Sequence, residues 1–318
     1  MSANFNTNCT VDYLCGIVNS RCLNPVSQNA YQLQDIANLM DLESNGFVVP
    51  LLKKVQQEYM VKNYDYPINQ GQTAYMMPSR AVGNALRDVV LVDSSGNEIG
   101  LNNLMREYIK SEFPCTWVPT VWSFGQYLTA NEINLFNTLW QSYTAYTLRF
   151  ITERRPNQLT LTTNCGQITA ITGNVVTLSY VDPSWTTSTT FDIINPGPPF
   201  NSIQDDQAVT LIAGFDLTFA SLPAGLAKGQ WVCPAGTTCV PQLPYEFYTL
   251  LIERTVSAVA EGLDMSQLLQ ASQRKCQELE ANMLCLVRPR VMGSVQKIIN
   301  KDNLSNGTTW GRGFGGYR

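Results

Sequence analysis

The sequence predicts an α+β protein in which helices from both ends of the chain form one discontinuous bundle and a β domain is inserted between them. Two observations support this: apolar residues recur at helical spacing over residues 27–66 and 244–287, and short β-type segments separated by turn residues fill most of 73–243. A helix with one apolar face needs a partner, so the two helical regions are expected to cover each other. The inserted domain is expected to be an antiparallel sandwich or barrel.

The N-terminal third begins with polar residues. Residues 1–26 show no clear period, and we interpret them as an irregular N-terminal arm. Helical spacing starts after Ser27, a suitable N-cap residue, and places four apolar residues on one side, namely Leu33, Ile36, Ala37 and Met40. Asn45–Gly46 is expected to end this helix and Pro50 to open a second one.

The middle of the chain is β in character. A turn cluster at 93–97 follows the apolar run Val89–Val92, and residues 98–110 are expected to form a short amphipathic helix. Further strands are expected at 120–128, 133–140, 145–154, 167–171, 175–180, 190–194, 208–212 and 216–219. Short strands at this spacing favour an antiparallel sandwich or barrel.

The C-terminal helical region, 244–287, predicts two helices. Pro244 suits a first helical turn, and Gly262 is expected to end the first helix. Asp264, three residues before Gln267, resembles a capping box that opens the second. Pro289 disfavours helix at the residue before it and closes the pair.

The last segment, 288–318, is rich in glycine near its end and carries six basic residues against the single acidic residue Asp302, a net charge of +5. Aromatic and arginine side chains are the types that dominate interface hot spots, so we interpret this segment as an extended docking tail. Its candidate interaction residues are Arg288, Arg290, Lys297, Lys301, Trp310, Arg312, Phe314, Tyr317 and Arg318.

The composition of the chain disfavours several classes of function. The chain has 318 residues, a net charge of −4, 14% charged residues and no histidine. The absence of histidine removes the usual general base and the commonest zinc ligand, and a net negative chain disfavours polyanion binding. We therefore expect a protein that is not an enzyme and binds no cofactor or metal. No apolar run suits a membrane span, and no secretion signal is expected.

The nine cysteines form no CxxC pair and are odd in number, so we expect mostly buried free thiols in a reducing environment. Cys233 and Cys239 flank a turn and are the pair best placed to form a disulfide under oxidation. The others are Cys9, Cys15, Cys22, Cys115, Cys165, Cys276 and Cys285.

Three residue sets could carry chemistry, each beside a simpler interpretation. Asp182, Asp192, Asp205 and Asp206 could act as paired carboxylates or ligate a hard cation, but turn and cap roles are favoured. Arg149, Arg154 and Arg155 could contact nucleic acid with Lys297 and Lys301, but a solvated or intersubunit face is favoured. Arg80 and Arg87 could be ion-pair partners on a segment packed against a neighbouring subunit, and a merely structural role is equally compatible with the pattern.

A family resemblance rests on five segments. They are YMMPSRAVGNALRDV (75–89), RRPNQL (154–159), FDII (191–194), LPYEFYTLL (243–251) and VRPRVMGSVQKIIN (287–300). In this order they resemble the head-to-tail adaptor (connector or neck) proteins of tailed bacteriophages. The resemblance spans most of the chain beyond Tyr75.

The resemblance implies a structural virion protein located in the neck and assembled in the host cytoplasm. About twelve copies would form a homo-oligomeric ring beneath the portal protein, with tail or nozzle proteins below it. The C-terminal segment would reach the portal, and genomic DNA would pass through the ring without sequence-specific contacts.

A second function class is a β-sandwich virion protein that binds a carbohydrate or receptor. It would use the aspartates named above together with four tryptophans as aromatic platforms, namely Trp117, Trp122, Trp140 and Trp185. A closed ring would favour the adaptor, whereas a trimer with glycan binding would favour this alternative.

Overall fold

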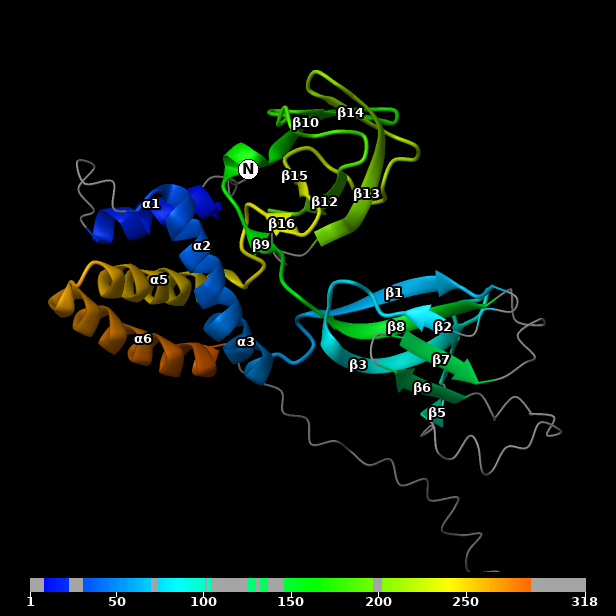
Figure 1. Ribbon diagram of the computed structural model, residues 1–318, viewed down its shortest axis with the longest axis horizontal. Coiled ribbons are helices and arrows are strands. Elements are labelled where there is room, and N and C mark those ends of the chain that lie inside the picture. The colour runs from blue at the N-terminus through cyan, green and yellow to red at the C-terminus, as the bar shows by residue number, and fades with distance from the viewer. Residues whose placement is uncertain are drawn as a thin grey trace, which may run out of the picture.

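The structure is a computed structural model that describes residues 9–22, 31–69, 72, 74–100, 102–103, 125–129, 132–136, 146–196 and 202–286. It is a mixed α+β chain with a closed antiparallel β-barrel, which confirms the predicted class. Figure 1 shows the helices gathered on one side, with the barrel and the remaining sheets as separate bodies. None of the described helices has the length and apolar character that a membrane span requires.

Helices from the two ends of the chain contribute to one hydrophobic core. They are α1 (Val11–Arg21), α2 (Leu33–Glu43), α3 (Val49–Val55), α5 (Tyr248–Gly262) and α6 (Ser266–Leu286). Helix α5 contacts α1, α2 and α6, as Figure 1 also shows. Its buried side chains, Leu251 and Val256 among them, share the core with Ile36 and Met40 of α2. Burial of apolar surface between these segments is the main force that holds the chain ends together.

The prediction of an irregular arm over residues 1–26 is wrong for the part that the structure describes. Helix α1 occupies Val11–Arg21, and the Oγ1 atom of Thr10 caps it by accepting a hydrogen bond from the Tyr13 amide at 3.4 Å. Its buried face is formed by Val11, Leu14, Cys15 and Val18. This face has helical spacing, but one of its members is a cysteine that serves as a small hydrophobic residue.

The predicted break at Asn45–Gly46 is also wrong. A π-helix, Ser44–Val48, joins α2 to α3, so the chain stays helical through the glycine. Pro50 lies in the first turn of α3, as predicted. The helical region ends earlier than residue 66, because Val61–Pro67 forms strand β1.

Two four-stranded sheets form the next part of the chain. Their strands are β1 (Val61–Pro67), β2 (Ala74–Met76), β3 (Ala81–Val92), β4 (Glu98–Gly100), β5 (Asn102–Asn103), β6 (Gly125–Thr129), β7 (Glu132–Phe136) and β8 (Thr147–Arg154). The first sheet has the order β1-β8-β3-β4 and the second β2-β7-β6-β5. The prediction of a helix over 98–110 is wrong at 98–100 and 102–103, because these residues form strands. Residues 104–110 lie outside the described residues.

The barrel has the strand order β10-β11-β14-β13-β12-β15. Its strands are β10 (Gly166–Thr172), β11 (Val175–Leu178), β12 (Thr190–Ile194), β13 (Ser202–Ala213), β14 (Asp216–Phe219) and β15 (Trp231–Pro234). Alternate side chains point inward, so Ile168, Val176, Phe191, Leu217 and Val232 form a separate core. A parallel pair of short strands, β9 (Gln158–Leu159) and β16 (Thr237–Thr238), lies beside the barrel.

The turn between α5 and α6 differs in detail from the prediction. Gly262 is the last residue of α5, and a Cβ atom there would lie 2.1 Å from the Tyr31 hydroxyl oxygen, so this glycine permits close packing of α5 against the chain before α2. The left-handed conformation falls on Asp264, with φ of 55°. The Met265 carbonyl accepts a hydrogen bond from the Leu269 amide of α6 at 2.9 Å, so Met265 is the N-cap residue of this helix. Asp264 lies one residue earlier, and the predicted capping box does not form.

Candidate functional site

A buried ion pair joins the β1-β8-β3-β4 sheet to the barrel. Arg80 precedes β3, and Asp192 lies at the centre of β12 with no exposed surface. The guanidinium contacts both carboxylate oxygens: Nη1 donates to Oδ2, and Nη2 donates to Oδ1 at 2.8 Å. This two-pronged geometry is the one in which an arginine recognises a carboxylate most strongly.

The Asp192 carboxylate accepts further hydrogen bonds from three other segments. The Asn157 side-chain amide donates to Oδ2 at 2.7 Å, and the Gly236 backbone amide does so at 3.0 Å. The Asp206 backbone amide donates to Oδ1 at 3.0 Å. Asp192 therefore ties β13, the β15–β16 turn and the segment after β8 to Arg80.

A second ion pair lies next to the first. Arg154 of β8 is 6% exposed, and its Nη2 lies 3.0 Å from the Asp205 carboxylate. Lys62 of β1 donates to the same carboxylate at 2.5 Å. Arg80 also contacts the Asp206 carboxylate at 2.5 Å. Three basic and three acidic side chains thus meet where the sheet and the barrel come together, and we call these six residues and Asn157 the junction cluster.

The charges of the junction cluster reinforce one another. Burial alone would raise the pKa of Asp205, but Arg154 and Lys62 outweigh burial and lower it below its ordinary value of 3.8. Burial alone would lower the pKa of Arg80, but hydrogen bonding to Asp192 and the nearby carboxylates raise it. Both groups are therefore fixed in their charged forms at neutral pH, which suits a structural junction better than proton transfer.

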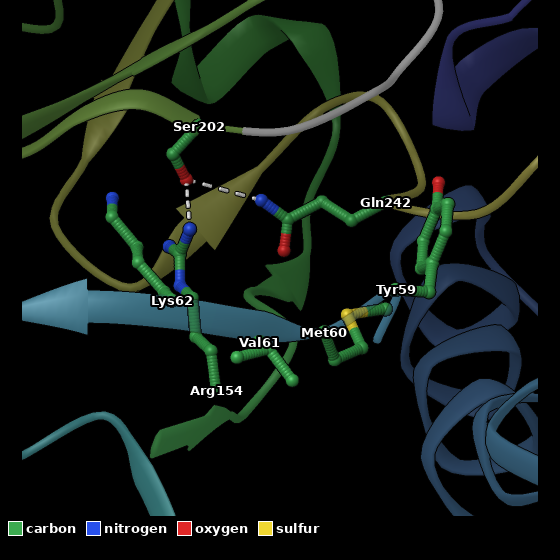
Figure 2. A pocket seen from close by; sticks show the side chains of 7 residues that line it. All are labelled: Tyr59, Met60, Val61, Lys62, Arg154, Ser202 and Gln242. Atoms are coloured by element: carbon green, nitrogen blue, oxygen red, sulfur yellow. Dashed lines mark hydrogen bonds between the residues drawn. The ribbon is translucent and has the colours of Figure 1, made fainter. Parts of the chain in front are cut away.

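A cavity of about 180 Å³ lies between the junction cluster and the helices. Figure 2 shows Arg154 and Gln242 converging on the Ser202 hydroxyl, with Tyr59 and Met60 on the helical side. Gln242 Nε2 donates to Ser202 Oγ at 3.2 Å. The Tyr59 hydroxyl and Arg154 Nε have no hydrogen-bond partner in the structure. A space of this size has room for a few ordered water molecules at about 30 Å³ each, and these two groups could bind them.

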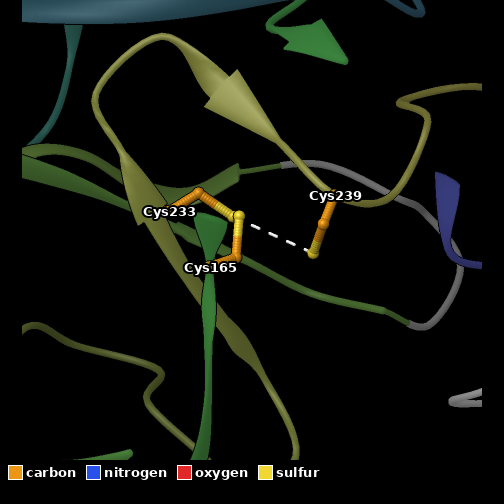
Figure 3. A group of neighbouring side chains, drawn as sticks. All are labelled: Cys165, Cys233 and Cys239. Carbon is orange, nitrogen blue, oxygen red and sulfur yellow. Dashed lines mark hydrogen bonds between the residues drawn. The ribbon is translucent and has the colours of Figure 1, made fainter. Parts of the chain in front are cut away.

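Three buried cysteines form a second cluster, where the barrel meets the helices. Cys165 lies just before β10, Cys233 in β15 and Cys239 just after β16. Their sulfur atoms all lie within 4.8 Å of one another, and those of Cys233 and Cys239 are 3.9 Å apart (Figure 3). Burial alone would raise the pKa of Cys233, but its hydrogen bonding with the Cys165 and Cys239 thiols lowers it.

The predicted aspartates are placed in two groups. Asp192, Asp205 and Asp206 belong to the junction cluster, where arginine and lysine neutralise them. Asp182 lies in a turn, where its Oδ1 accepts a hydrogen bond from the Ser184 amide at 2.8 Å, in agreement with the turn interpretation. The structure gives the first three a role in ion pairing, which the turn interpretation had missed.

Four of the five predicted arginines, Arg80, Arg87, Arg149 and Arg154, have acidic partners within the chain. Arg155 is exposed and forms no ion pair with the described residues. Arg80 belongs to the junction cluster, and Arg87 pairs with Glu58 and with Glu153 at 3.6 Å. Arg149 pairs with Asp65 at 2.7 Å and with Glu98 at 2.8 Å. Pairing of this kind leaves little free positive charge for phosphate contacts, so a structural interpretation of these side chains is favoured over a nucleic-acid interface. An intersubunit role of Arg80 and Arg87 stays a prediction.

Several predicted interaction residues lie outside the described residues. These are all the docking-tail residues, from Arg288 to Arg318, and the tryptophans Trp117, Trp122 and Trp140. Trp185 is described, and it is buried against Phe191 inside the barrel. It therefore offers no exposed platform for a sugar ring. No protein-family model matches the chain, and no curated protein matches it in sequence.

Proposed function

We propose that this chain is a structural virion protein, a head-to-tail adaptor whose copies form a ring between the portal and the tail. The observation that carries the proposal is the spread of exposed apolar side chains over all three parts of the molecule. Leu42 on α2 is 67% exposed, Met76 on β2 62% and Phe215 beside β14 59%. A ring subunit touches neighbours on more than one side, and an exposed apolar side chain on each of its bodies is compatible with such contacts.

The helices from the two chain ends are interpreted as the discontinuous bundle of such an adaptor. A groove of about 770 Å³ lies beside them, between α3 and the residues that follow β8. Val49, Pro50 and Pro156 are among its apolar lining residues, and Lys53 and Arg155 are among its basic ones. Protein–protein contacts combine apolar and charged groups in this way, so this groove is offered as one intersubunit surface.

The described charge distribution fits passage of DNA better than capture of DNA. The arginines of β3 and β8 are paired with carboxylates, and the whole chain has a net charge of −4. A surface whose cations are already neutralised releases few counterions on contact with phosphate. We therefore infer sliding of DNA without sequence-specific binding.

Portal docking is assigned to residues 288–318. Ordering a glycine-rich backbone costs roughly 1 to 2 kcal/mol per residue, so such a segment needs a partner to offset that cost. Trp310, Phe314 and Tyr317 supply apolar contact area, and Arg312 and Arg318 supply charge for acidic groups between portal subunits. Within a ring, one engaged tail holds its neighbours at high effective concentration.

Deletion of residues 308–318 tests this assignment. The truncated protein should keep the melting temperature of the full chain and yet fail to remain on portal-bearing heads. A control that replaces Arg312 and Arg318 by lysine keeps the charge and should bind with intermediate occupancy. Wild-type occupancy of the truncated protein would move the docking role to the helical bundle. A compact trimer that binds glycans would instead support the carbohydrate- or receptor-binding alternative.

A further inference from the structure

The three-cysteine cluster is organised in a way that free core thiols do not require. Cys165, Cys233 and Cys239 come from three separate segments, yet each is no more than 1% exposed and all three sulfurs lie within 4.8 Å of one another (Figure 3). A cysteine that serves only as a small hydrophobic residue needs no second sulfur beside it. Among the described residues, these three cysteines are the set of side chains whose ligand atoms lie close enough together to hold one metal ion.

The sulfur spacing matches a shared metal ion better than a disulfide. Two thiolates bound to one ion at about 2.3 Å, with a tetrahedral or trigonal angle, lie about 3.8 to 4.0 Å apart. The sulfurs of Cys233 and Cys239 are 3.9 Å apart. Because all three sulfurs lie within 4.8 Å of one another, closing the set around an ion requires shifts of about 1 Å or less.

The donor set selects the class of ion. Thiolate is a soft ligand, and Zn²⁺ and Cu⁺ have filled d shells that accept sulfur ligands without a strong geometric preference of their own. Three sulfurs complete a trigonal Cu⁺ site, whereas Zn²⁺ would take a fourth, non-thiolate ligand. Hard cations such as Mg²⁺ and Ca²⁺ are excluded, because they require oxygen ligands.

We propose that Cys165, Cys233 and Cys239 form a structural binding site for one thiophilic d¹⁰ cation, Zn²⁺ or Cu⁺. The ion would bind three thiolates and release their protons to solvent. It would connect the start of β10 with both sides of the β15–β16 turn. The Val11 amide donates to the Cys239 carbonyl at 2.8 Å, so the ion would also fix the point where α1 meets the barrel. The proposal replaces the expectation from composition that the chain binds no metal, and it is independent of the proposed adaptor function.

Metal analysis of the full-length chain, purified anaerobically with a thiol-free reductant, tests the proposal. We expect one ion per chain, identified as zinc or copper by mass spectrometry of the elements. Replacement by Co²⁺ should give the intense sulfur-to-cobalt charge-transfer absorption of a thiolate site. Cys239→Ala and Cys165→Ser should both lose the ion. Cys276→Ala is the matched control, because Cys276 is 2% exposed but lies in α6, outside the cluster, and it should keep the ion.

A second measurement covers the case in which a cluster variant fails to fold. Removing the ion from the unaltered chain with a chelator should lower its melting temperature and make three additional thiols reactive toward a thiol reagent. Re-addition of the ion should reverse both effects. The proposal is overturned by a chain that binds neither ion and gives no charge-transfer band with Co²⁺. It is equally overturned by equal metal content in Cys239→Ala, or by a Cys233–Cys239 disulfide in protein isolated from cells.

Discussion

Replacing Asp192 by asparagine tests how much the junction cluster contributes to the fold. The substitution keeps the shape of the side chain but turns one carboxylate oxygen into an NH₂ group. Oδ2 accepts from Arg80, Asn157 and Gly236, and Oδ1 accepts from Arg80 and Asp206. Whichever way the new amide is oriented, at least two of these hydrogen-bond donors then point at the NH₂ group, which cannot accept. No rotation of the side chain can avoid this conflict.

The magnitude follows from burial. Asp192 is fully buried and the Arg80 side chain is only 11% exposed, so solvent cannot replace the lost bonds. A hydrogen bond to a charged group contributes about 1.5 to 3 kcal/mol, and breaking a buried ion pair costs about 3 to 5 kcal/mol. Arg80 keeps its contact with Asp206, which lowers the cost of its unpaired charge. We expect Asp192→Asn to lower the free energy of unfolding by about 3 to 5 kcal/mol.

The assay is guanidinium denaturation of the full-length chain, followed by circular dichroism. Asp182→Asn is the matched control, because the Asp182 carboxylate is hydrogen-bonded to Ser184 in an exposed turn, and its effect should stay below about 1 kcal/mol. If Asp192→Asn also stays within about 1 kcal/mol of the unaltered chain, the junction cluster does not hold the sheet and the barrel together as described.

Three further predictions concern other residues. Gly166→Ala should lower stability by about 1 to 3 kcal/mol in thermal denaturation, because the added Cβ would lie 2.3 Å from the Tyr180 carbonyl oxygen; an unchanged midpoint would contradict this packing. Glu253→Ala should cost about 1.5 to 3 kcal/mol, because this buried carboxylate pairs with Arg21 and Lys275, whose own side chains are partly exposed and can be hydrated when it is removed. Exposed Glu261→Ala should cost less than about 0.5 kcal/mol. In an acid titration, the free energy of unfolding should fall as the pH drops below 3.8, the ordinary pKa of Asp205, because the folded protein holds this pKa at a lower value. Asp205→Asn should make the free energy of unfolding depend less on pH in this range. An unchanged pH dependence would refute the assignment.

The sequence predicted the fold best where hydrophobic spacing is regular and local. Helices α5 and α6 lie within the predicted 244–287, and strands β8, β11, β12 and β14 lie in predicted strand regions. Helix α1 was missed because Cys15 is part of its apolar face and was not counted as an apolar residue. The π-helix at Ser44–Val48 was missed because packing of Val48 into the core outweighs the tendency of Asn45–Gly46 to end a helix.

The candidate sites could not be predicted from spacing, because each is assembled from distant segments. Arg80 was recognised as an ion-pair residue and Asp192 as a carboxylate near a strand end, but nothing local connects the two. They meet only when β12 takes its place in the barrel beside the residues before β3. Likewise, Cys233 and Cys239 flank one turn and were paired correctly as neighbours, whereas Cys165 joins them through the barrel's β10–β15 pairing.

An asymmetric electron cryomicroscopy reconstruction of the neck of virions that carry this chain tests the adaptor proposal most directly. We expect a closed ring of about twelve copies directly below the portal, into which the barrel, the sheets and the helices can be fitted. We also expect density for residues 288–318 to extend from each copy onto the portal. Copies arranged as trimers at a distance from the portal, or a neck that lacks this chain, would contradict the proposal.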